Sequence, residues 1–162
     1  MAAGSTYTPI ATNTLGSATA SVTFSSIPST YTDLILICNV SATAGSPIIR
    51  VEYNADATNY SDTFLSGNGT SASSGRDSNV AYISLDPSLS TGISNNIIQI
   101  FNYANTNVFK TLIARGNNAA NGTIATVGLW RNTNAINAVK LTISSSTFIS
   151  GSTFTLYGIT AA

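Results

Sequence analysis

Alternation of apolar and polar residues near the C-terminus restricts this chain to a β-sheet fold more firmly than any other feature. Within Thr153–Tyr157, Phe154 and Leu156 alternate with residues that carry hydroxyl groups. Successive side chains of a β-strand point to opposite faces, so this spacing gives one face for a core and one for solvent or a partner. Only three residues follow Ile159, and an apolar strand so close to the chain end is expected to be firmly paired in a sheet.

The same period of two recurs along the chain, and no segment sustains the 3.6-residue period of an amphipathic helix. Leu34–Cys38 is continuously apolar, as a strand buried on both faces would be. The sequence predicts an all-β, single-domain antiparallel β-sandwich, jelly-roll-like, with about ten strands. Strands are expected at residues 7–15, 18–25, 34–38, 48–53, 62–65, 80–85, 96–103, 110–115, 123–131 and 136–144, with a last one ending near residue 159; those at 123–131 and 136–144 are expected to form a hairpin around residues 132–134.

The length of 162 residues suits one domain. We expect a polar N-terminal arm at residues 1–15 and the sandwich at residues 16–162. Pro9 would place any strand of the arm at a sheet edge, because proline cannot donate a ladder hydrogen bond. The first residues show neither the charged nor the apolar segment of a signal peptide. No apolar run approaches the roughly 20 residues of a membrane span.

Charged residues are scarce. They make up 7% of the chain, and the net charge is zero, whereas about 25% is usual in soluble domains. Such a chain lacks the basic face that nucleic-acid binding requires, so no nucleic acid and no membrane are expected as partners. A surface of hydroxyls and amides offers little charge repulsion, which favours packing against copies of itself or a larger assembly. The alternative is a stable domain whose surface has no binding role.

The residue inventory argues against enzymatic chemistry. The chain has no histidine and a single cysteine, which excludes histidine-based nucleophile activation and thiolate metal clusters. Cys38 lies in an apolar run and is expected to be a buried, unreactive thiol. Asp56 and Asp62 lie in adjoining segments and are the best available pair for glycoside hydrolysis or Ca²⁺ binding. Turn-forming aspartates are the preferred interpretation. We therefore expect no enzyme, no cofactor and no metal.

Aromatic residues and two polar stretches remain as candidates for contacts. Trp130, the single tryptophan, shares a strand face with Gly128, and we prefer a core or subunit-interface role for it over sugar stacking. Tyrosine is enriched at interfaces, so the tyrosines are open to both interpretations. Residues 66–79 and 116–122 are rich in Gly, Ser, Thr and Asn and are expected to be loops. A loop of the former length is uncommon in a compact domain and is often functional.

Three segments resemble a known class of proteins. VGLWRNTNAI (127–136), AVKLTIS (138–144) and FISGSTFTLYGI (148–159) resemble the closing segment of β-sandwich virion proteins of tailed bacteriophages, and residues 22–38 and 48–61 are similar to strands nearer their start. The class includes capsid decoration proteins, head fibres and tail-fibre tips. The resemblance implies a structural protein that assembles as a homotrimer. It leaves open where in the virion the chain belongs.

From this resemblance and the composition we expect a capsid decoration, or cement, protein on the outer surface of a phage capsid, folded in the host cytoplasm. Its partners would be the major capsid protein and copies of itself. The alternative is a head-fibre or tail-fibre tip that binds host-surface glycans. The expected contact residues form two groups. The interface group is Tyr7, Pro9, Ile10, Trp130 and Tyr157, and the loop group is Asn68, Arg76, Asp77, Asn117 and Asn118.

Overall fold

The chain forms a sandwich of two antiparallel sheets. The computed structural model describes residues 6–85, 89–118, 120 and 122–160. Twelve strands and no helix lie in these residues, so the predicted all-β antiparallel sandwich is confirmed, with slightly more strands than the expected ten or so. No helix of the described chain is therefore long and apolar enough to cross a membrane.

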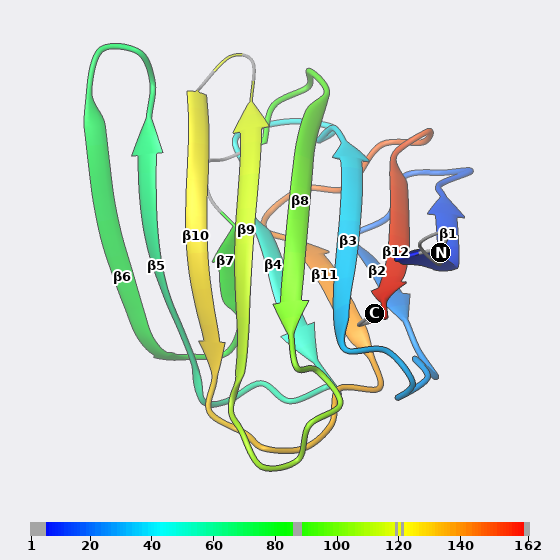
Figure 1. The fold of residues 1–162 in the computed structure, drawn as a ribbon. Coiled ribbons are helices and arrows are strands. Elements are labelled where there is room, and N and C mark those ends of the chain that lie inside the picture. Colours follow the sequence, from blue (N-terminus) through cyan, green and yellow to red (C-terminus); the bar gives the residue numbers. More distant parts are fainter. Residues whose placement is uncertain (1–5, 86–88, 119, 121, 161–162) are drawn as a thin grey trace.

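The two sheets are unequal in size. The large sheet has eight strands in the order β1 (Tyr7–Thr14), β12 (Thr153–Ile159), β3 (Asp33–Val40), β8 (Ser94–Phe101), β9 (Lys110–Asn118), β10 (Gly122–Trp130), β5 (Tyr60–Gly67) and β6 (Ala72–Val80). The small sheet has four, in the order β2 (Ser21–Phe24), β11 (Val139–Ile143), β4 (Ile49–Tyr53) and β7 (Ile83–Leu85). Figure 1 looks onto the large sheet, with the small sheet behind it. We call the face of the large sheet that is turned away from the small sheet the outer face.

The core lies between the sheets and follows the period-two pattern. On β12, Phe154 and Leu156 are fully buried, as their alternation predicted, and the strand is paired on both sides, with β1 and β3. Burying such a side chain contributes about 1.5–3 kcal/mol. Cys38 is also fully buried, and burial raises the pKa of its thiol, so it is the expected unreactive residue. The expectation that β3 is buried on both faces is only partly right, because Ile37 on the outer face is half-buried.

The segment expected to be a long loop at residues 66–79 is instead a hairpin. β5 continues to Gly67 and β6 begins at Ala72, and the two pair residue by residue. In the turn, the Asn68 Oδ1 accepts hydrogen bonds from the backbone N–H groups of Thr70 and Ser71. β6 lacks apolar alternation because it is the last strand of the sheet and almost all its side chains are exposed. An edge strand in solvent on both faces has no core to fill.

The hairpin expected at residues 123–144 does not form. β10 belongs to the large sheet and β11 to the small sheet, so the chain crosses between the layers after Trp130. The side chain of Asn54 holds this crossing. Its Nδ2 donates to the carbonyl of Ala135, and its Oδ1 accepts from the N–H groups of Asn137 and Ala138. The turn-like sequence at residues 132–134 is therefore part of a connection between the two sheets, not the turn of a hairpin.

The expected N-terminal arm is largely part of the sandwich. β1 pairs with β12 along its length and forms an edge of the large sheet, as the position of Pro9 predicted. The pairing register shifts between Pro9 and Ala11, so the edge is irregular at the proline. An arm outside the sheet can comprise only the residues before Tyr7, and residues 1–5 lie outside the described part of the chain.

Candidate functional site

The acids that sequence analysis considered for catalysis have structural partners. Asp56 Oδ1 accepts hydrogen bonds from the N–H and the hydroxyl of Thr58, and its Oδ2 accepts one from Trp130 Nε1 at 2.9 Å. The Thr58 hydrogen bond is the main cause of a lowered Asp56 pKa, with Trp130 and Asn132 adding to it. Asp56 is thus an ionised anchor and does not have the raised pKa of a general acid.

The second acid, Asp62, is buried on β5 and its Oδ2 accepts a hydrogen bond of 2.9 Å from the N–H of Ser84. It therefore helps to fasten β7 of the small sheet to the large sheet. The described residues contain no group of three His, Cys, Asp or Glu side chains that could hold a metal ion. Asp56 therefore lies in a turn, as the preferred interpretation held, whereas Asp62 is a buried strand residue and not a turn-forming one.

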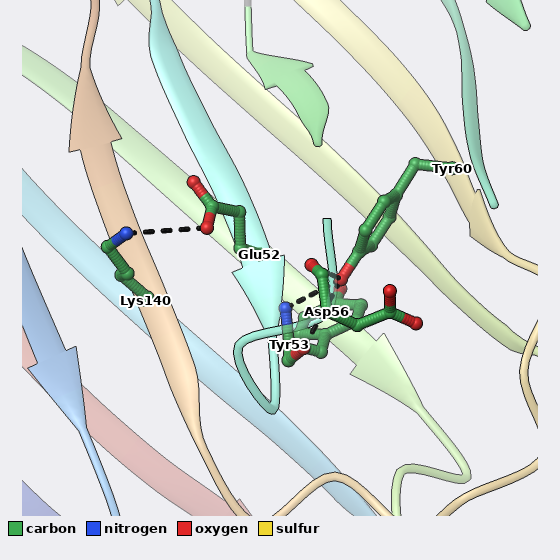
Figure 2. Close-up of polar contacts among 5 residues, drawn as sticks. All are labelled: Glu52, Tyr53, Asp56, Tyr60 and Lys140. Atoms are coloured by element: carbon green, nitrogen blue, oxygen red, sulfur yellow. Dashed lines mark hydrogen bonds and ion pairs between the residues drawn. The ribbon is translucent and has the colours of Figure 1, made fainter. Parts of the chain in front are cut away.

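Trp130 belongs to a buried aromatic cluster. Its ring stacks on Tyr60 with centroids 6.0 Å apart and meets Tyr53 edge-on at 5.6 Å. Figure 2 shows the Tyr60 hydroxyl between its partners: it accepts from the N–H of Tyr53 at 2.8 Å and lies 3.2 Å from the carbonyl oxygen of Asp56. Burial raises the pKa of Tyr60. Trp130 is 1% exposed, so it is a core residue and not a surface contact of this chain.

Lys110 is a buried residue that sequence analysis missed. Its Nζ donates to three carbonyl oxygens, those of Asn105, Val108 and Thr133, at 2.6, 2.8 and 3.0 Å. Burial lowers the pKa of the ammonium group. The three acceptors use the three protons that a lysine can donate. Lys110 therefore ties the loop before β9 to the crossing after Trp130, and its ammonium protons are occupied.

The outer face is the surface that remains, and it is apolar in its centre. Strand pairing places Tyr157, Ile35, Gln99, Ile113 and Val127 in one row across five strands. The neighbouring row contains further apolar residues. We define the apolar band as the large apolar residues of both rows: Tyr157, Ile35, Ile113, Val127, Ile37, Ile97 and Leu65.

Several side chains of the apolar band are open to solvent. Ile113 is 49% exposed, Val127 54% and Leu65 64%. A hollow of about 430 Å³ lies over the band, lined by Tyr7, Ile35, Ile37, Ile97, Gln99, Ile113 and Arg115. Single exposed apolar residues are ordinary, but a contiguous patch of them marks a contact surface. The outer face is therefore the candidate functional site.

One margin of the band is a polar row, which we call the polar rim. It runs across the sheet through Thr14, Thr153, Asn39, Asn95, Asn117 and Thr123. Asn39 Nδ2 donates to Thr153 Oγ1 at 3.4 Å, and Asn117 Oδ1 accepts from the N–H of Asn95 at 2.8 Å. An apolar centre beside a polar margin is the usual arrangement of a protein interface.

A second hollow, of about 520 Å³, lies over β5, β6 and β10. It is lined by Ser61, Asp62, Thr63, Arg76, Thr111, Val127, Gly128, Leu129 and Arg131. Arg131 is fixed there, because its Nη1 donates to Ser61 Oγ and its Nη2 to Asn79 Oδ1, both at 2.6 Å. This hollow thus places the guanidinium groups of Arg76 and Arg131 beside the apolar side chains of Val127 and Leu129.

The expected interface residues separate into two sets. Tyr7 and Tyr157 meet edge-to-face at 6.3 Å on the outer face, and Pro9 pairs with Tyr157. Ile10 points the other way, toward the core, and lines a hollow with Phe24 and Leu156. With Trp130 buried, the outer face brings together three of the five expected residues.

The expected loop residues are also divided. Asn68 lies in the β5–β6 turn, but Arg76 and Asp77 lie on β6 and point to opposite faces of the sheet. Asn117 is on the polar rim, whereas Asn118 is 1% exposed and points inward. The placement in loops is therefore wrong for all but Asn68, because β6 contains Arg76 and Asp77 and β9 extends to Asn118.

Most of the apolar band was not among the residues predicted from the sequence, although a signal for it was present. The uninterrupted apolar runs at residues 34–38 and 97–98 were compatible with strands that are apolar on both faces. No family model matches the chain, and comparison with curated protein sequences finds no relative.

Proposed function

We propose that the chain is a non-enzymatic structural protein of a phage virion, a capsid decoration protein that binds the outer surface of the shell and stabilises it. The exposed apolar band on the large sheet is the observation that carries the proposal. The sequence resemblance to phage virion sandwiches supports it, as does a charge content too low for repulsion between packed copies. The proposal includes the homotrimer that the resemblance implies.

The mechanism is burial of surface. Strands are spaced about 4.8 Å apart, and side chains on one face recur about every 7 Å along a strand. Eight strands and three or four rows of side chains therefore offer a face of about 800 to 1,100 Å². Standard interfaces bury about 800 Å² per partner, so one outer face is large enough for a specific contact. Several copies on one shell would add their contacts through effective concentration.

The test is the number of copies per purified virion, measured by quantitative mass spectrometry against the major shell protein. A fixed ratio to the shell protein, with hundreds of copies per particle, is expected. Shells that lack the chain are expected to unfold at lower temperature, and added purified chain should restore the wild-type temperature. Absence of the chain from the particle would contradict the proposal.

A fibre tip that binds glycans is the second candidate, and the second hollow favours it. Ser61, Thr63 and Arg76 offer hydroxyl and guanidinium groups beside the apolar floor of that hollow, an arrangement that suits a sugar ring. The buried Trp130 cannot serve as the stacking platform. A few copies per virion, together with glycan binding that is lost in Arg76→Ala, would favour this function over capsid decoration.

A further inference from the structure

The cations of this neutral chain are unevenly distributed. Lys140 pairs with Glu52 at 3.4 Å on the small sheet, and this is the only ion pair among the described residues. Lys110 is enclosed by carbonyl groups, and Arg50 lies over the Tyr82 ring at 4.1 Å. The remaining cations are Arg76, Arg115 and Arg131. In the described structure none of the three has a carboxylate within 4.0 Å.

All three arginines lie on the outer face. Arg76 pairs with Thr63, which pairs with Val127 of the apolar band. Arg115 lies between Ile97 and Ala125 and lines the hollow over the band. Arg131 projects into the second hollow. The face therefore combines apolar side chains with three positive charges.

The carboxylates are mostly engaged elsewhere. Glu52, Asp56 and Asp62 have the partners described above. Asp33 begins β3 on the outer face, where it accepts a hydrogen bond of 2.8 Å from the N–H of Asn102. Asp77 is exposed, but it points to the opposite side of β6 from Arg76. Of the described charges, three arginines and one aspartate share the outer face, a balance of +2.

This arrangement limits what can cover the apolar band. A partner that buried Arg115 without supplying an anion would leave an unpaired charge out of water, which is costly. A second copy that presented its own outer face would bring three more arginines and one aspartate already bonded to a backbone group. A carboxylate of another protein, in contrast, can accept paired hydrogen bonds from a guanidinium.

We propose that the outer face docks a partner protein whose contact surface is apolar and carries carboxylates. These carboxylates meet Arg115 and the two arginines of the second hollow, Arg76 and Arg131. The inference rests on the proposed function, in which that partner is the shell protein. Contacts between copies in a trimer then use another surface. Arg131 is already held by Ser61 and Asn79, so little side-chain entropy is lost when its remaining N–H groups bind a carboxylate.

The experiment measures binding of the purified chain to shells assembled from the major shell protein alone. Arg115→Glu and the double variant Arg76→Glu/Arg131→Glu are expected to reduce affinity at least tenfold, and Arg115→Gln less. Lys140→Glu makes the same charge change on the small sheet and should bind like wild type. Wild-type affinity should fall as salt rises from about 50 to about 500 mM, more steeply than that of Arg115→Glu.

The outcomes separate the two proposals. If the wild-type chain does not bind the shells, the proposed function fails and the inference fails with it. If wild type and Arg115→Glu bind equally, or if Lys140→Glu is equally impaired, the inference alone is overturned.

Sedimentation velocity of the purified proteins tests whether a second copy of the chain covers the outer face instead. An oligomer that dissociates in Arg115→Glu would assign the outer face to a second copy. Wild-type binding to a DNA duplex at physiological salt would likewise overturn the choice of a protein partner. Circular dichroism of each variant verifies the fold.

Discussion

Trp130 and Asp56 are joined by a hydrogen bond of 2.9 Å from the indole Nε1 to the carboxylate Oδ2. The bond links the end of β10 in the large sheet to the turn that follows β4 in the small sheet. It satisfies the indole N–H of a side chain that is 1% exposed. The pair thus closes one end of the sandwich, and the tryptophan is a spectroscopic probe for that end.

Removing the acceptor should destabilise the fold. Asp56→Ala leaves the Trp130 N–H without its partner, at a cost of about 1–3 kcal/mol for a buried polar group. Asp56→Asn retains a side-chain acceptor and should cost less. Urea unfolding followed by the fluorescence of the single tryptophan measures both variants. Equal stability of Asp56→Ala and wild type would show that the hydrogen bond contributes nothing.

Acid should weaken the same end of the sandwich. The pKa of Asp56 is lowered in the folded chain, chiefly by the hydrogen bond from Thr58. A lowered pKa means that the group stabilises the fold above its unfolded pKa of about 3.9 and that this contribution disappears as pH falls through the folded value. The urea midpoint should therefore fall more between about pH 5 and pH 2 in wild type than in Asp56→Asn. A drop of equal size in the two proteins would contradict the assignment.

Lys110 should be required as a donor. Lys110→Met keeps much of the aliphatic volume but leaves the carbonyls of Asn105, Val108 and Thr133 without this donor. The expected loss is on the order of 1–3 kcal/mol, the cost of unpaired buried polar groups. Thermal unfolding measures it, with Lys140→Met as the control because the Nζ of Lys140 has one partner, Glu52, in a partly exposed ion pair. A loss no larger than that of the control would assign Lys110 a packing role only.

The sandwich was predictable from the sequence because period-two alternation is a local property of each strand. The alternation of Phe154 and Leu156 was sufficient to place β12. Prediction from alternation failed for β6, because Ala72–Val80 is not covered by a second layer and therefore has no apolar face. It also failed after Trp130, since a polar turn is compatible with either a hairpin or a crossing between sheets. The Asn54 contacts that hold the crossing come from about 80 residues earlier in the chain.

The candidate site was less predictable than the fold. An apolar run such as Leu34–Cys38 shows that both faces of a strand are apolar, but which face is left uncovered depends on the other elements of the fold. The arginines of the outer face are separated in sequence, and only the strand register brings Arg76 and Arg115 to the same side as the apolar band. Tyr7 and Tyr157 were named as interface candidates, and strand pairing places both on the outer face. Their part in an interface stays a prediction.

The two faces of β10 should respond differently to substitution. Val127 on the outer face is 54% exposed, and Ile113 beside it on β9 is 49% exposed. The double variant Ile113→Thr/Val127→Thr keeps β-branched residues in both strands, so its free energy of unfolding should stay within about 1 kcal/mol of wild type. Its affinity for shells should nevertheless fall at least tenfold, because the apolar centre of the contact becomes polar.

Gly128 provides the opposite case on the same strand, because it faces the core. A Cβ built at Gly128 would lie 2.7 Å from two side-chain carbons of the fully buried Ile83, so Gly128→Ala overpacks the space between the sheets. Overpacking costs about 1–3 kcal/mol. Gly128→Ala should therefore lower the urea midpoint, while the protein that remains folded binds shells with wild-type affinity. If the Ile113/Val127 variant also kept wild-type affinity, the outer face would not be the surface that contacts the shell.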